Sequence, residues 1–132
     1  MINWRTVTLN PELVQHVYGS LDPVLDQTRL LSLKLLDEGT TLKFSLSLKD
    51  IPTNPPQRWS RNSRYNAINM EFQAWNLLSL EITGTPPFGT VCCAFERIES
   101  GSITIRLTGT GLNLTATVDS VRINHLTPYL TS

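Results

Sequence analysis

The stretch Thr41-Leu42-Lys43-Phe44-Ser45-Leu46-Ser47-Leu48-Lys49 decides the fold class of this 132-residue chain. Leucine and phenylalanine alternate here with threonine, serine and lysine, which gives one apolar and one polar face at the two-residue period of a β-strand. The same alternation returns from Asn66 to Phe72. The sequence therefore predicts two strands, at about 41–49 and 65–75, on either side of a long loop.

The connection between these strands, Asp50 to Arg64, is longer than most loops of compact domains, so it is expected to be functional or disordered. Three arginines fall within it, and no acidic residue occurs between Asp50 and Glu71. Arginine together with large aromatic rings is typical of binding hot spots. The candidate partner-binding residues are Arg58, Trp59, Arg61, Arg64 and Tyr65. The alternative is that Trp59 folds back over a sheet edge and that the arginines are solvated.

Alternating apolar and polar residues continue through the rest of the chain, separated by glycine and proline turns. Further strands are predicted at about 29–37, 77–83, 90–99, 102–108, 112–119 and 121–126. In the strand at 29–37 the pattern places Leu31, Leu33 and Leu35 on one face. Asn76 is the only plausible turn residue between the strands at 65–75 and 77–83.

A short helix is predicted near the N-terminus, at about 10–19. Asn10 is expected to cap it, Pro11 suits its first position, and Gly19 ends it.

Each strand has one polar face that suits contact with solvent, and no stretch between the strands supplies helical crossovers, so the strands are expected to pair antiparallel. We therefore predict a mainly β (α+β) fold. It consists of a single antiparallel meander sheet of about eight strands, curled or two-layered, with one short N-terminal helix. The length suits a single domain, 1–132.

Eleven basic and eleven acidic side chains cancel, so the chain has no general field that would hold nucleic acid or an anionic membrane. No long apolar run follows Met1, and the expected location is cytoplasmic. Cys92 and Cys93 are neighbours in a strand, where adjacent side chains point to opposite faces. They are predicted to be reduced structural thiols.

Residues for catalysis or metal binding are sparse. A hydrolase triad could draw only on His16 or His125, and His125 continues the inward face of Val121 and Ile123, so it is predicted to be a core or hydrogen-bonded residue. Histidine and cysteine spacings match no zinc site. The carboxylates that could form a catalytic pair occupy ordinary polar positions, namely Asp50, Glu71, Glu81 and Glu96. We predict no catalytic, cofactor or metal site.

From Ile51-Pro52 through Pro55-Pro56-Gln57-Arg58-Trp59 the chain resembles the immunity protein 50 family, antitoxin-type proteins of bacterial polymorphic toxin systems. Other landmarks occur in the order that the family shows, namely Val17-Tyr18-Gly19, Leu30 to Leu36 followed by Asp37-Glu38-Gly39, Leu42 to Leu48, and Asn66 before Ile68. The resemblance extends from about Val17 to Tyr129. It implies a protein without catalysis that neutralises a cognate toxin by direct binding.

Two other classes of function remain open from the residues alone. One is a β-domain that binds a small ligand or a carbohydrate, with Trp59 and Trp75 lining its pocket. The other, less favoured, is an enzyme.

Overall fold

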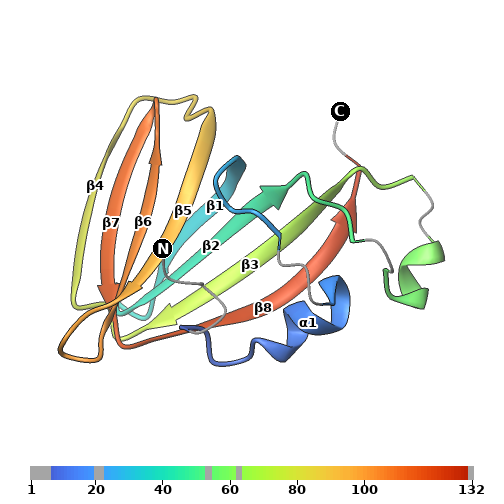
Figure 1. Cartoon of the computed structure of the whole chain (residues 1–132). Helices are drawn as coiled ribbons and strands as arrows, with labels where there is room; N and C mark the ends of the chain where they lie inside the picture. Colours follow the sequence, from blue (N-terminus) through green and yellow to red (C-terminus); the bar gives the residue numbers. More distant parts are fainter. Residues whose placement is uncertain (1–6, 20–22, 53–54, 62–63, 131–132) are drawn as a thin grey trace.

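The computed structural model describes residues 7–19, 23–52, 55–61 and 64–130, apart from the side chains of Ser60 and Arg61. These residues form one α-helix, one short 3₁₀-helix and eight β-strands (Figure 1). The elements are α1 (Glu12–Tyr18), β1 (Thr28–Leu36), β2 (Thr41–Leu48), η2 (Gln57–Arg61), β3 (Ala67–Trp75), β4 (Ser79–Gly84), β5 (Thr90–Arg97), β6 (Ile103–Gly109), β7 (Leu112–Val118) and β8 (Ser120–Tyr129). The strand ends fall close to the predicted positions, except that β8 continues to Tyr129, beyond the end expected at 126.

All eight strands pair antiparallel in one sheet, in the order β4-β7-β6-β5-β1-β2-β3-β8. The prediction of a mainly β fold with a short helix is confirmed. The order is not that of one continuous meander. It contains two three-stranded meanders, β1-β2-β3 and β5-β6-β7, to which β8 and β4 add at the outer edges.

The sheet is curled into two arms that diverge from a common corner, at the lower left of Figure 1. Among the described residues the arms are joined between β1 and β5 through only two residue pairs, Thr28 with Val91 and Arg29 with Thr90. The apolar faces of the arms meet inside this curl. Phe72 of β3 stacks on Phe44 of β2 at 5.1 Å and contacts Phe95 of β5 at 5.3 Å between ring centroids. A ladder of buried aromatic rings therefore links the two arms.

The chain crosses between the arms at the corner. Asn76, at φ 55°, turns the chain after β3, but β4 pairs with β7 and not with β3. The backbone N–H of Leu78 already donates to Thr117 of β7, at 2.8 Å. Asn76 is thus a turn residue, as predicted, but the turn leads into the other arm.

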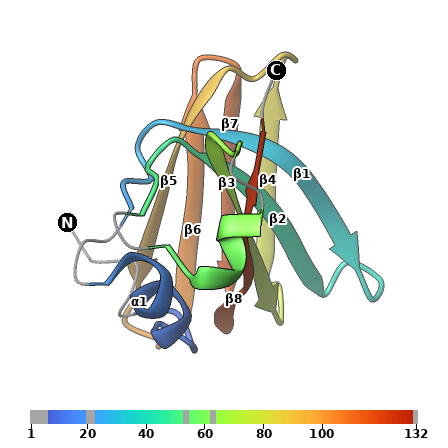
Figure 2. The same ribbon diagram turned by 90° about the vertical axis from the view of Figure 1, so that its right-hand side faces the viewer.

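The helix α1 lies beside β8, at the same end of the molecule as η2 (Figure 2). Val14 and Val17 are buried in the core, and Gly19 ends the helix at φ 68° with its N–H donating to Gln15. The predicted cap at Asn10 is wrong. The Asn10 side chain instead donates to the Ile123 carbonyl at 2.6 Å and accepts from the Ile123 N–H at 2.8 Å, because β8 is an edge strand whose backbone groups need partners.

Two β-bulges overturn predicted side-chain directions. In β1 the register with β2 passes from Leu30 to Ser32, so Leu31 is the extra residue and is 46% exposed, while Leu30 and Leu33 pack on the core. In β8 the register with β3 passes from Ile123 to His125. His125 is therefore exposed and not in the core. An inserted residue reverses the alternation of faces, and the two-residue period of the sequence does not reveal it.

Candidate functional site

The loop between β2 and β3 holds its tryptophan inward. Trp59 lies in η2, is 3% exposed and belongs to the hydrophobic core. Its ring meets that of Tyr65 edge to face, with centroids 5.7 Å apart and an angle of 82° between the planes. The backbone N–H of Trp59 donates to the carbonyl of Pro56 at 2.9 Å. Trp59 therefore braces the loop from within.

The first residues of this loop are tied to the N-terminal region through Asp50. Its carboxylate accepts the Val24 N–H at 2.8 Å, and its carbonyl accepts the Tyr18 hydroxyl at 2.7 Å. Burial raises the pKa of the Tyr18 phenol well above its ordinary value, and the charge of Asp50 adds to this effect. Tyr18 thus stays protonated and keeps donating, which anchors the loop to the end of α1.

The arginines of the loop, unlike Trp59, point outward where the structure describes their side chains. Arg58 and Arg64 are exposed, and Tyr65 is half-buried. The side chain of Arg61 lies outside the described residues. The structure therefore brings Trp59 and Tyr65 together in the interior and leaves the Arg58 and Arg64 side chains accessible.

A second surface, which the sequence did not single out, is the polar face of β1, β2, β3 and β8. Glu71 is its centre: Asn124 donates to the Glu71 carboxylate at 2.9 Å, and Lys43 and His125 approach it at 3.8 and 3.6 Å. Asn124 also donates to Gln73 at 2.9 Å. The β8 bulge is what turns Asn124 and His125 toward this network.

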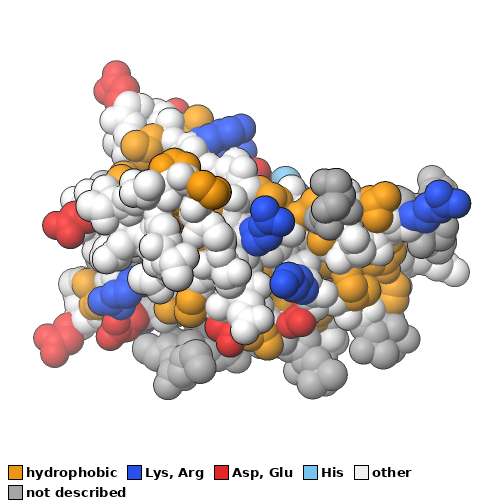
Figure 3. Space-filling view, turned by 90° about the horizontal axis from the view of Figure 1, so that it is seen from above, with side chains coloured by type: hydrophobic (Ala, Val, Ile, Leu, Met, Phe, Trp, Pro, Cys, Tyr) orange, Lys and Arg blue, Asp and Glu red, His pale blue; other side chains and the backbone are white. Residues whose placement is uncertain are grey.

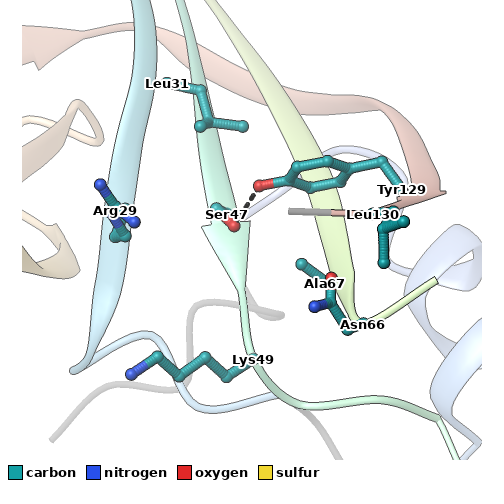
Figure 4. A pocket seen from close by; sticks show the side chains of 8 residues that line it. All are labelled: Arg29, Leu31, Ser47, Lys49, Asn66, Ala67, Tyr129 and Leu130. Atoms are coloured by element: carbon teal, nitrogen blue, oxygen red, sulfur yellow. Dashed lines mark hydrogen bonds between the residues drawn. The ribbon is translucent and has the colours of Figure 1, made fainter. Parts of the chain in front are cut away.

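One end of this face is hollowed into a cavity of about 390 Å³, where β2 enters the loop and β3 leaves it. Its lining residues are Arg29, Leu31, Ser47, Lys49, Asn66, Ala67, Tyr129 and Leu130. The Tyr129 ring extends over the small side chain of Ala67, and its hydroxyl donates to Ser47 (Figure 4). A tyrosine of β8 thereby reaches across β3 to β2 and forms one wall.

Two cations, Arg29 of β1 and Lys49 just after β2, line the opposite side of the cavity from Tyr129 and Leu130 (Figure 4). Both are exposed, and neither has an ion-pair partner among the residues that the structure describes. In the face seen from above Figure 1, basic side chains lie near the centre and also toward the edges, whereas most acidic ones lie along the left and lower rim (Figure 3). The cavity thus combines two positive charges with an apolar rim.

Sequence reasoning placed Lys49 and Ser47 on the polar face of their strand but did not join them to Arg29 or Tyr129. The adjacency depends on the β1-β2 register, in which Arg29 opposes Ser47, and on the pairing of Ala67 with Tyr129. The predicted end of the last strand at 126 also excluded Tyr129.

Catalytic groups do not assemble in the described part of the chain. His16 lies in the last turn of α1 and is exposed, while His125 faces Glu71. Glu96 is paired with Arg106 at 2.9 Å on the far arm. Among the described residues, no group of three or more histidine, cysteine or acidic side chains is placed to hold a metal ion. Cys92 and Cys93 are free thiols.

The two tryptophans proposed for a ligand pocket do not meet at the cavity. Trp59 is buried under the loop, and Trp75 is the last residue of β3, whose first residue, Ala67, lines the cavity. At about 3.3 Å per residue, the strand separates Trp75 from the cavity by most of its length. Neither indole lines the cavity wall.

Comparison with known proteins places the chain in a family. The model of the immunity protein 50 family matches residues 10–129, which is most of the chain. The chain belongs to the immunity protein 50 family. No curated protein and no solved structure matches it. The matched range contains α1, all eight strands, the loop and every lining residue of the cavity except Leu130, so both candidate surfaces belong to the matched domain almost entirely. No helix in the described ranges has the length and apolar character needed to cross a membrane.

Proposed function

We propose that this immunity protein neutralises a cognate toxin by forming a direct protein–protein complex and carries out no chemistry of its own. The family match over residues 10–129 is the observation that supports it, since an immunity protein implies a toxin as protein partner and immunity proteins are generally not enzymes. We further propose, from the same resemblance, that it is an antitoxin of a bacterial polymorphic toxin system and acts in the cytoplasm.

The loop from Asp50 to Tyr65 is our proposed contact region. Its arginines, Arg58, Arg61 and Arg64, would make charge-assisted hydrogen bonds to acidic groups of the toxin. Trp59 and Tyr65 would hold the loop in shape from inside, because a loop that is already ordered loses less entropy on binding. The formal net charge of zero argues against a polyanion mimic that covers a basic nuclease cleft.

The test uses the toxin domain encoded by the adjacent reading frame. It is co-purified with the wild-type chain, and affinity is then measured by calorimetric titration. Arg58→Glu combined with Arg64→Glu should weaken binding by several kcal/mol, because glutamates would oppose the acidic surface that the arginines met.

The matched control carries the same charge change at exposed positions away from the loop, Lys34→Glu with Arg97→Glu. It should bind as the wild type does. Circular dichroism confirms that both variants are folded. A wild-type chain that does not bind the toxin would contradict the proposed function, and unchanged affinity of the arginine variant would move the contact to another surface.

A further inference from the structure

We propose that the cavity lined by Arg29 and Lys49 receives a carboxylate from an acidic segment of the partner protein. This proposal rests on the proposed function, since it names the chemistry by which the partner would be recognised at a second site beside the loop. No residue of this cavity was among the sequence-based candidates.

The charge of the cavity is the first argument. Arg29 and Lys49 line the same hollow, and Arg29 lies opposite Ser47, two residues before Lys49, so the two like charges are neighbours across paired strands, which is unfavourable. A neighbouring carboxylate would normally relieve this repulsion. Asp50, which follows Lys49 directly, instead gives its carboxylate to the Val24 N–H, and Glu71 is engaged by Asn124, Lys43 and His125. The cavity therefore keeps two positive charges without a counter-charge from the described residues.

The shape of the cavity is the second argument. The Tyr129 ring is fixed by its hydrogen bond to Ser47, so this wall is set before a ligand arrives. Leu31 and Leu130 are 46% and 62% exposed at the rim, where an extended acidic segment could cover them. A hollow of about 390 Å³ has room for one or two side chains and not for a folded domain.

The position of the cavity is the third argument. It lies where β2 ends and β3 begins, and these are the two points from which the loop with Arg58 and Arg64 extends. An acidic surface of the partner that contacts the loop would thus also lie against the cavity. Two cationic groups from different elements, Arg29 from β1 and Lys49 from β2, favour a carboxylate held between them, because an arginine fork binds both oxygens and lysine adds a point charge.

The experiment titrates the whole ¹⁵N-labelled chain with a blocked tetraglutamate peptide while amide shifts are recorded. The expected result is a saturable shift at Ser47, Ala67 and Leu130, which weakens with added salt. Arg29→Gln with Lys49→Gln should weaken the binding by about tenfold, and Lys34→Gln with Arg97→Gln should leave it unchanged. A blocked tetraglutamine peptide should cause no saturable shift.

Several outcomes would overturn the proposal. Shifts of equal size with tetraglutamine, or shifts confined to other parts of the sheet, would show that the cavity does not bind a carboxylate. Tighter binding of inorganic phosphate than of the peptide would make it a phosphate site. Self-association of the free chain in sedimentation, lost in the Arg29→Gln, Lys49→Gln variant, would assign the cavity to a second copy.

The cavity proposal and the proposed function can be disproved independently of each other. If the toxin domain binds the wild-type chain and an Arg29→Glu, Lys49→Glu variant equally well, the cavity is not used and the proposed function stands. If the toxin does not bind the wild type at all, the peptide titration still decides whether the cavity takes carboxylates.

Discussion

The side-chain amide of Asn76 donates a hydrogen bond to the carboxylate of Asp119, at 2.9 Å, and these two residues lie in the two chain crossings between the arms of the sheet. Asn76 follows β3 on the way to β4, and Asp119 separates β7 from β8. The backbone N–H of Asp119 also donates to Trp75, at 3.0 Å. The two crossings are therefore fastened to each other at the corner from which the arms diverge.

Asn76→Ala should destabilise the protein more than Asn76→Gly. Both changes remove the bond to Asp119, but Asn76 has φ 55°, where a side chain other than that of asparagine or aspartate is strained and glycine is not. The alanine variant should lose about 1–2 kcal/mol of the free energy of unfolding. Urea denaturation measures the difference. A glycine variant less stable than the alanine variant would show that the turn is not strained.

Phe44→Ala should cost about 3–5 kcal/mol of the free energy of unfolding, the range for truncating a buried aromatic residue. Phe44 is fully buried and stacks on Phe72. Lys43→Ala, on the other face, should cost less than about 1 kcal/mol. The ion pair that it removes, between Lys43 and Glu71 at 3.8 Å, is partly exposed, and such pairs contribute little to stability. Denaturant midpoints in the opposite order would mean that the β2 register is shifted by one residue.

Trp59→Ala should destabilise the protein by about 3–5 kcal/mol, because the indole is buried and packs on Tyr65. Its neighbour Arg58 is exposed, so Arg58→Ala should change stability by less than about 0.5 kcal/mol. Thermal unfolding followed by circular dichroism compares the two variants. A Trp59→Ala variant as stable as the wild type would mean that the indole does not brace the loop.

Cys93 should resist alkylation in the folded protein, whereas Cys92 reacts. Cys93 is buried, and this burial raises the pKa of its thiol well above the ordinary value, with Cys92 adding to the effect. Cys93 is therefore expected to be unreactive, because alkylation requires the thiolate and Cys93 keeps its proton. Mass spectrometry after iodoacetamide treatment should show one rapid adduct, and a second only in denaturant. Two adducts at equal rates in the native protein would contradict this prediction.

The same raised pKa has a consequence for stability. Below the ordinary cysteine pKa of about 8.5 the thiol is protonated in both the folded and the unfolded chain, so its contribution to stability is constant. Above that pH the unfolded chain loses the proton that Cys93 keeps when folded. The free energy of unfolding should therefore fall as the pH rises above about 8.5. In Cys93→Ala the fall should be smaller, when each protein is compared with its own free energy of unfolding at neutral pH. Urea titrations at several pH values measure it.

The sequence by itself determined which residues form strands and which face of most strands is apolar. Alternation in Leu42 to Leu48 and in Ile103 to Leu107 is a local property of the chain, and the leucine, isoleucine and phenylalanine side chains there are buried as it predicts, because a strand turns successive side chains to opposite sides. The cluster of arginines in the loop and the resemblance to the immunity protein 50 family were accessible in the same way, since composition and motifs are local.

Tertiary structure alone decided the strand order, the bulges and the cavity. Nothing local to Asn76 indicates that β4 pairs with β7, because β7 follows only after β5 and β6 in the chain. The bulges at Leu31 and Asn124 each place one extra residue against the partner strand, and they turned Leu31 outward and removed His125 from the core. Arg29, Lys49 and Tyr129 come from three separate segments, so only the pairing of β1, β2, β3 and β8 could bring two positive charges and a fixed aromatic wall to one hollow.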